Sequence, residues 1–369
     1  MTHNFAPDCK HYLGDRPCIH EKICFCESYD PLNPRILIIK LGALGDVVRT
    51  TCLLPTLKRL YPKSHITWIS KDNGVRILDT HPLIDRLVTF NLDGIITVMG
   101  QKFDLVLSCD KDKEPIALCN LIDSTDKRGI CMSTYGTPIP CNEHAKYYCA
   151  LGLDNFLKFK SNSLTYPELI HSALGLDYIR EPYQLYCNKT DIVRARLIFS
   201  SFRNNYDKKI IGVNTGSGST YANKSPRTSY LIDLCKKLIK NGYIIALLGG
   251  LTEEKDHDDI IKNIGSGIFS TGCHNTEQQF VAIIDQCDLV ITGDTLALHV
   301  GIARKVPIIA LFGPTCEQEI DLYGLGVKKI SKLDCSPCYK NKCNKTPNCI
   351  DSIPINKVIA SVSQLLYNK

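Results

Sequence analysis

The segment LGALGD (41–46) ends in a carboxylate that could act as a catalytic base. It follows a short apolar run, and its two glycines allow the backbone to turn sharply from a strand into a helix. Asp46 then lies at the start of that helix, where a carboxylate either caps the helix or projects into a cleft as a general base. The spacing departs from the G-x-G-x-x-G fingerprint of dinucleotide-binding proteins, which disfavours a nicotinamide enzyme.

The segment GVNTGSGSTYANK (212–224) is a candidate phosphate-binding loop. Its small residues expose backbone N–H groups that can bind an anion, and Lys224 could neutralise charge that develops on a phosphate. The spacing differs from a Walker A loop, and a flexible polar loop is the alternative interpretation. The residues predicted to contact the donor here are Asn214, Thr215, Gly216 and Ser217.

A third segment, LLGGLTEEKDH (247–257), combines two glycines with an acidic pair. Gly249 and Gly250 end a predicted strand and allow a ligand to approach the backbone closely. Glu253 or Glu254 could accept hydrogen bonds from a ribose or sugar hydroxyl. Acidic residues also begin helices for electrostatic reasons, so this segment is weak evidence by itself.

The fourth segment, residues 288–315, predicts a strand, a Gly293-Asp294-Thr295 turn, a helix and a second strand. The start of such a helix presents free N–H groups and a positive dipole end to an anion. His299 lies one turn into the helix, on the same side as the expected cleft, although a lone helical histidine is often structural. The segment therefore predicts an anion site at the start of this helix.

Alternating apolar runs and helical patterns place these segments at strand ends in two doubly wound α/β units. Parallel strands bind ligands beyond their carboxyl ends, so the loops of the two units are expected to face one cleft. The predicted strands are 35–40, 65–70, 103–108, 209–215, 243–249, 288–292 and 307–313. The predicted helices are 47–60, 227–241, 252–263, 276–286 and 295–304, with further helices near 147–153 and 166–174.

The length of 369 residues favours two domains. We expect a Cys-rich segment over 1–33, an acceptor-binding domain over 34–190, a nucleotide-sugar-binding domain over 208–330, and a Cys knuckle with a C-terminal helix over 331–369. The net charge of +6 suits a protein that handles phosphates or touches an anionic membrane, and it is too small for a dedicated nucleic-acid binder. Because neither a signal peptide nor a membrane-spanning run is evident, a cytoplasmic protein with optional peripheral contact at the inner membrane is expected.

Taken together, the four segments resemble glycosyltransferase family 9, the heptosyltransferase-type enzymes with the GT-B fold. The resemblance is carried by ILIIKLGALGDVVRTTCLLPTLKRLYP, GVNTGSGSTYANK, LLGG and GDTLALHVGIARKVPIIALFGPT, in that order along residues 35–315. It implies an inverting transfer of a sugar, with ADP-heptose as donor and a glycan, a lipid-linked sugar or a protein as acceptor. No cofactor is then required for the chemistry.

The resemblance also implies roles for single residues. Asp46 matches the family's catalytic aspartate, which takes the proton of the acceptor hydroxyl, and Lys224 matches the lysine that contacts the donor phosphates. Asp294, Thr295 and His299 match the donor-binding loop, and Glu253 matches the glutamate that holds the ribose, with Glu254 as the alternative. Two departures fall on the donor side: Leu296 replaces a glycine, and Ser225-Pro226 replaces an aromatic residue.

Eight of the 19 cysteines form two clusters, one near each end of the chain. Four thiolates at C-x2-C-x4-C-x5-C spacing suit a tetrahedral Zn or Fe ion, and an iron–sulfur cluster, a disulfide pair or idle thiols are the alternatives. Whether the clusters make one site or two is open, and a structural role is favoured because neither adjoins the cleft loops in sequence. The predicted ligands are Cys335, Cys338, Cys343 and Cys349, and, more loosely, Cys9, Cys18, Cys24 and Cys26.

Two other functions fit parts of the pattern. A nucleotide-sugar epimerase of the same architecture would need further carboxylates in the cleft. A metal-knuckle protein that binds nucleic acid or a partner would need aromatic and basic residues interleaved near the cysteines, where Tyr339 is the only aromatic residue.

Overall fold

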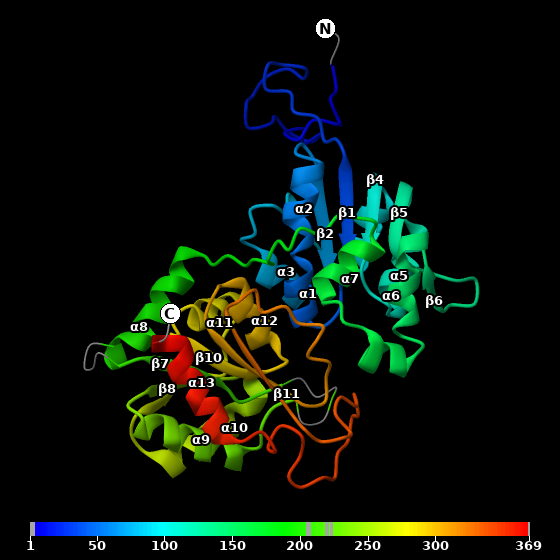
Figure 1. The fold of residues 1–369 in the computed structure, drawn as a ribbon. Coiled ribbons are helices and arrows are strands. Elements are labelled where there is room, and N and C mark those ends of the chain that lie inside the picture. The colour runs from blue at the N-terminus through cyan, green and yellow to red at the C-terminus, as the bar shows by residue number, and fades with distance from the viewer. Residues whose placement is uncertain (1–3, 204–207, 218–220, 222–223, 368–369) are drawn as a thin grey trace.

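The computed structural model describes residues 4–203, 208–217, 221 and 224–367. It contains two six-stranded sheets, each flanked by helices, and so confirms the predicted fold of two facing α/β units (Figure 1). No helix in these described ranges is long and apolar enough to cross a membrane.

The first sheet has the strand order β3-β2-β1-β4-β5-β6, with every pair parallel except β5–β6. Its order reverses at β1, which is where a doubly wound sheet opens a crevice for ligands. The strands are β1 Arg35–Ile39, β2 His65–Ser70, β3 Arg86–Thr89, β4 Lys102–Ser108, β5 Asp123–Met132 and β6 Pro138–Pro140. The helices are α1 Leu44–Thr50, α2 Leu53–Leu60, α3 Asp72–Leu78, α4 Leu92–Met99, α5 Lys113–Leu121, α6 Lys146–Ala150 and α7 Tyr166–Ala173, with short turns at Glu143–Ala145 and Leu157–Ser161.

The helix predicted over 47–60 is wrong as a single element. It begins earlier, at Leu44, and breaks between α1 and α2 at Thr51 and Cys52. Pro55 explains the break, because it has no N–H to donate to the carbonyl of Thr51 and is tolerated only in the first turn of a helix. The effect is to confine the helix that carries Asp46 to two turns after the loop that follows β1.

The second sheet is entirely parallel, with the order β12-β11-β10-β7-β8-β9. Strands β7, β8, β10 and β11 are buried along their whole length, as expected for apolar runs covered on both faces. The strands are β7 Ile210–Asn214, β8 Ile244–Leu248, β9 Ile268–Ser270, β10 Leu289–Gly293, β11 Ile308–Phe312 and β12 Gly326–Ile330. The helices are α8 Lys189–Arg203, α9 Thr228–Lys240, α10 Glu254–Ile264, α11 Glu277–Ile284, α12 Leu296–Ala303 and α13 Ile355–Tyr367, with a short turn at Leu251–Glu253.

Packing between the two units fixes how their ligand-binding edges face each other. Helix α1 packs against α12, and α3 packs against α11. The ion pair of Arg76 with Glu277, at 2.8 Å, joins the same two helices α3 and α11. The buried core is also continuous across the units, since Ile36 of β1 and Ile308 of β11 belong to one apolar cluster.

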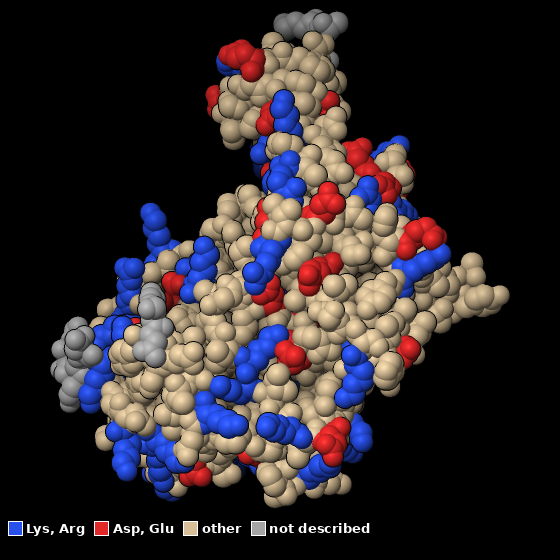
Figure 2. All heavy atoms as spheres, in the orientation of Figure 1, with Lys and Arg blue, Asp and Glu red and all other residues tan. Residues whose placement is uncertain are grey.

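Three segments outside the sheets have defined positions. The N-terminal Cys-rich segment forms a lobe at the end of the first unit that lies away from the second unit (Figure 1). Helix α8 packs against α11. Helix α13 packs against α9, β11 and β12, so the chain ends on the second unit. Lysine and arginine side chains gather on the second unit in the view of Figure 2.

Candidate active site

The loop between β1 and α1 is held in place by a buried carboxylate. Asp110, just beyond β4, accepts hydrogen bonds from the backbone N–H groups of Leu41 and Gly42, the latter at 3.0 Å, and forms an ion pair with Lys40. Burial alone would lower the pKa of Lys40, but the negative charge of Asp110 more than offsets it and the pKa is raised. A Cβ at Gly42 would lie 2.7 Å from Lys40 Nζ and 2.8 Å from Asp110 Oδ1, so a larger residue here would displace this ion pair.

Asp46 is the third residue of α1 and not its cap, since Ala43 occupies the N-cap position. The alternative that Asp46 caps the helix is therefore wrong. Its carboxylate forms an ion pair with Arg49 Nη2 at 2.9 Å. Burial raises the pKa of Asp46, but the positive charges of Arg49 and Lys40 outweigh that effect, and the pKa lies below its ordinary value. Asp46 is thus ionised at neutral pH and able to accept a proton.

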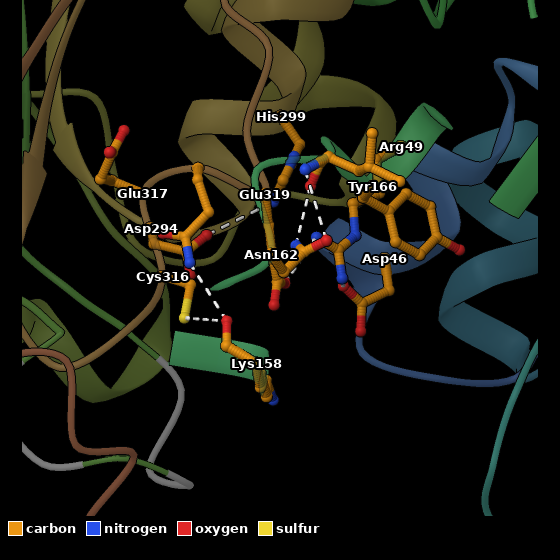
Figure 3. Close-up of polar contacts among 12 residues, drawn as sticks. Asp46, Arg49, Lys158, Asn162, Tyr166, Asp294, His299, Cys316, Glu317 and Glu319 are labelled. Atoms are coloured by element: carbon orange, nitrogen blue, oxygen red, sulfur yellow. Dashed lines mark hydrogen bonds and ion pairs between the residues drawn. The ribbon is translucent and has the colours of Figure 1, made fainter. Parts of the chain in front are cut away.

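Arg49, which the sequence interpretation missed, lies between two carboxylates (Figure 3). Its Nη1 atom is 3.9 Å from Glu319 Oε2, and its guanidinium lies 3.8 Å from the ring centroid of Tyr166. The i, i+3 spacing from Asp46 was a signal that the sequence did contain. Glu319 gave no such signal, because it lies in an irregular loop after β11.

On the opposite side of the cleft, Asp294 follows β10 and contacts two nitrogen groups. Lys224 Nζ is 3.5 Å from its carboxylate, and His299 Nε2 is 3.6 Å from it. Burial would raise the pKa of Asp294, but His299 and Lys224 hold it well below its ordinary value. The pKa of His299 is lowered by burial in spite of Asp294, which favours the neutral ring.

Glycine at position 45 allows the two halves of the site to meet. A side chain at Gly45 would lie 2.7 Å from His299 Cδ2, so α1 and α12 approach closely at this point. The same His299 ring contacts the hydroxyl of Tyr183 through Nδ1 at 3.4 Å. The structure therefore brings Asp46, Lys224, Asp294 and His299 around one cleft, although they come from two different sheets.

A cavity of about 310 Å³ opens beside this cluster at the carboxyl ends of β7 and β8. Of Glu253 and Glu254, only Glu253 lines it, while Glu254 pairs with His274 on the surface. Leu44 reaches the cavity from the first unit, two residues before Asp46. The predicted donor residues that line it are Asn214, Gly216, Ser217, Gly249, Gly250, Glu253 and Thr295, and the lining residues that the sequence did not reveal include Asn275, Thr276 and Phe280.

Four predicted donor residues, among them Asp294 described above, lie next to the cavity without lining it. Thr215 is buried, and its hydroxyl contacts His257 Nε2 at 2.9 Å and Leu248 O at 3.2 Å. Gly293 is crowded, since a side chain there would lie 1.9 Å from the carbonyl oxygen of Lys224. The fourth is His299, which lies behind Asp294. Positions 218–220 and 222–223 of the predicted phosphate loop lie outside the described residues.

The C-terminal cysteine knuckle contacts the loop after β11, although the two segments are not adjacent in sequence. The N–H groups of Cys338 and Tyr339 donate to Pro314 O at 3.0 and 2.9 Å. The Tyr339 ring stacks on Phe159 of the first unit with centroids 5.4 Å apart, and its hydroxyl accepts from the N–H of Cys316 at 3.1 Å. The knuckle thus braces the loop that leads to Glu319.

The cysteine clusters do not form an assembled metal centre. All cysteines in the described ranges are free thiols. Within those same ranges, no group of three His, Cys, Asp or Glu side chains is placed to hold a metal ion. The N-terminal cluster surrounds a cavity of about 730 Å³, where the His11 and His20 rings meet edge to face. Metal binding at either cluster remains a prediction.

Two parallel sheets that face each other across a cleft, with a carboxylate on one side and an anion-binding helix start on the other, define a glycosyltransferase of the GT-B type. A model of glycosyltransferase family 9 (heptosyltransferase) matches residues 165–348. The chain belongs to glycosyltransferase family 9, as the sequence motifs implied. This assignment decides against the epimerase and the metal-knuckle binding protein as the class of the chain.

Similar proteins span nearly the whole chain. Lipopolysaccharide heptosyltransferase 1 of Campylobacter coli is 22% identical over 363 residues, which cover 90% of this chain and 98% of that protein. The structure of a family 9 glycosyl transferase from Veillonella parvula matches with a TM-score of 0.72 at 20% identity, over 91% of this chain and 98% of the other. The structure of Escherichia coli ADP-heptose LPS heptosyltransferase II matches with a TM-score of 0.66 at 17% identity, over 90% of this chain and 98% of the other. These structures bear out the GT-B fold.

Proposed function

We propose that this enzyme transfers heptose from ADP-heptose to a hydroxyl of a lipopolysaccharide-type sugar, with inversion at the transferred carbon. The observation that carries the proposal is the placement of Asp46 opposite the Lys224–Asp294 pair, beside the cavity that Leu44 and Glu253 share. The names of the similar proteins supply the heptose, the ADP and the lipopolysaccharide. A peripheral position at the inner membrane would suit such an acceptor and remains a prediction.

Each half of the site has its own role in this proposal. Asp46 takes the proton of the acceptor hydroxyl as the oxygen attacks the sugar carbon, and no covalent sugar–enzyme intermediate forms. The leaving diphosphate is stabilised by Lys224 and by the N–H groups at the start of α12, which Leu296 and Ala297 present to the cavity. Glu253 is the proposed partner of the ribose hydroxyls.

The test is a transfer assay with a panel of nucleotide sugars. Purified enzyme is incubated with ADP-heptose, ADP-glucose or UDP-sugars, with and without a truncated lipopolysaccharide acceptor, and released diphosphate is measured. We expect ADP-heptose to be consumed fastest and its consumption to depend on the acceptor. If no nucleotide diphosphate sugar binds in isothermal titration calorimetry, the proposal is refuted.

The variant Asp46→Asn tests the base. We expect a loss of transfer of at least about 10²-fold, typical for removal of a general base, with the dissociation constant of the donor changed by less than about twofold. The matched control is Asp123→Asn, at the exposed start of β5, which should behave as wild type. Turnover of Asp46→Asn within a few-fold of wild type would mean that another group accepts the proton.

A further inference from the structure

Two carboxylates from different units contact opposite ends of one guanidinium. Arg49 Nη2 binds Asp46 at 2.9 Å, while Arg49 Nη1 lies 3.9 Å from Glu319. The plane of the guanidinium is covered by the Tyr166 ring at 3.8 Å, and Arg49 Nε is buried with no hydrogen-bond partner among the described residues. The position of Arg49 is therefore set by the two carboxylates and the ring, and a change at one carboxylate is felt at the other.

Glu319 is held where it can take part in this contact. The N–H of Tyr166 donates to the backbone carbonyl of Glu319 at 2.8 Å, which ties its loop to the first turn of α7. Its side chain is only 17% exposed. Burial raises the pKa of the Glu319 carboxyl, against the opposing charges of Arg49 and Lys158. Glu317, two residues earlier, points elsewhere and pairs with Lys328 at 2.8 Å.

The shared guanidinium bears directly on the proposed base. An ion pair with arginine stabilises the ionised form of Asp46 and so makes it a weaker acceptor for the proton of an alcohol. A second carboxylate on the same guanidinium offsets part of that positive charge and draws the group away from Asp46. The other charged or titratable groups around the pair are Lys40, Lys158, Asp294 and His299.

We propose that Glu319 is a positioning residue for sugar transfer: it holds one end of the Arg49 guanidinium and thereby limits how tightly the other end binds Asp46. The inference rests on the proposed function, because it assumes that Asp46 accepts the acceptor proton. Glu319 itself exchanges no proton with the substrate in this scheme. Through Glu319, the strength of Asp46 as a proton acceptor in the first unit depends on a loop of the second unit.

The experiment is a double-mutant cycle with Glu319→Gln and Arg49→Met, read as kcat and donor dissociation constant. In Glu319→Gln we expect kcat to fall about tenfold and donor binding to change less than about twofold, since Arg49 then binds Asp46 more tightly. In the Arg49→Met background the same Glu319→Gln change should alter kcat by less than about twofold, because the group through which it acts is gone. Glu317→Gln is the matched control and should keep wild-type kcat.

The outcomes separate this inference from the proposed function. If Asp46→Asn abolishes transfer while Glu319→Gln keeps wild-type kcat, Glu319 has no positioning role and the function stands. An equal loss of kcat from Glu319→Gln in the wild-type and Arg49→Met backgrounds would also overturn the inference. So would a donor dissociation constant that rises in Glu319→Gln as much as kcat falls. If Asp46→Asn retains turnover, Asp46 is not the base, whatever the result of the double-mutant cycle. Donor titration and thermal unfolding of each variant confirm that it is folded.

Discussion

The buried ion pair between Lys40 and Asp110 beside the β1–α1 loop leads to a prediction about stability. Lys40 and Asp110 have side chains that are 4% and 5% exposed, so neither charge can be solvated if its partner is lost. The change Asp110→Asn keeps the shape and one acceptor oxygen but leaves Lys40 unpaired. Breaking a buried pair in this way costs about 3–5 kcal/mol.

That cost can be measured by urea unfolding followed by tryptophan fluorescence, because the single tryptophan, Trp68, lies in the first sheet. For a denaturant slope of about 3 kcal/mol/M, the midpoint should fall by about 1–1.7 M. The double change Lys40→Met with Asp110→Asn removes both charges and should recover more than half of the loss. The exposed control Asp123→Asn should shift the midpoint by less than about 0.2 M.

Two results would refute this reasoning. A loss below about 1 kcal/mol in Asp110→Asn would mean that Lys40 finds another partner or water when Asp110 is neutral. A double variant as unstable as the single one would place the cost in the hydrogen bonds from Leu41 and Gly42 and not in the unpaired lysine. In either case, the loop that leads to Asp46 would be held by something other than the charge of Asp110.

Two more predictions address pH and the donor cavity. Burial lowers the pKa of His81 from its usual 6.5 to about 4. A backbone hydrogen bond with Gln184 has a smaller, opposite effect on this pKa. The unfolded chain therefore binds a proton that the folded one excludes. The contribution of the neutral His81 ring to the free energy of unfolding is complete above pH 6.5 and falls by up to about 3 kcal/mol as the pH drops to 4. In His81→Phe, the urea midpoint should therefore vary less with pH across that range. A side chain at Gly216 would lie 2.2 Å from Glu253 Cδ, so Gly216→Ala should weaken donor binding about tenfold in calorimetry. The control is Gly100→Ala, after α4 in the first unit, where a Cβ would lie 3.5 Å from Ile96 O; it should leave the donor affinity unchanged.

The sequence revealed the parts of the site that follow strands. Asp46, Asp294 and the glycines at 249 and 250 come directly after apolar runs, and the carboxyl ends of parallel strands gather such residues at one edge of a sheet. Glu319 could not be found in this way, because it lies in an irregular loop seven residues after β11 ends. Its proposed role depends on a contact with Arg49 of α1, which lies far from it in the sequence and in the other unit.

Two of the strands that the sequence did not indicate have little apolar surface. Strand β12, with the sequence GVKKI, lies at the edge of the second sheet and is only partly buried, so it lacks the continuous apolar run of β10 or β11. Strand β6 is three residues long and includes two prolines. The hydrophobic pattern identifies strands through their burial, and edge strands of this kind escape it.

The continuous core between the units constrains how the site can work. Interfaces between domains are commonly polar and allow the domains to move, but here Ile36 and Ile308 share one apolar cluster and α1 packs on α12. The close approach of Gly45 and His299 lies inside this interface. A rigid shift of one unit against the other would therefore disturb buried packing as well as the Arg49 contacts. Under the proposed function, the donor would therefore bind in a cavity whose walls are held by packing within and between the two units.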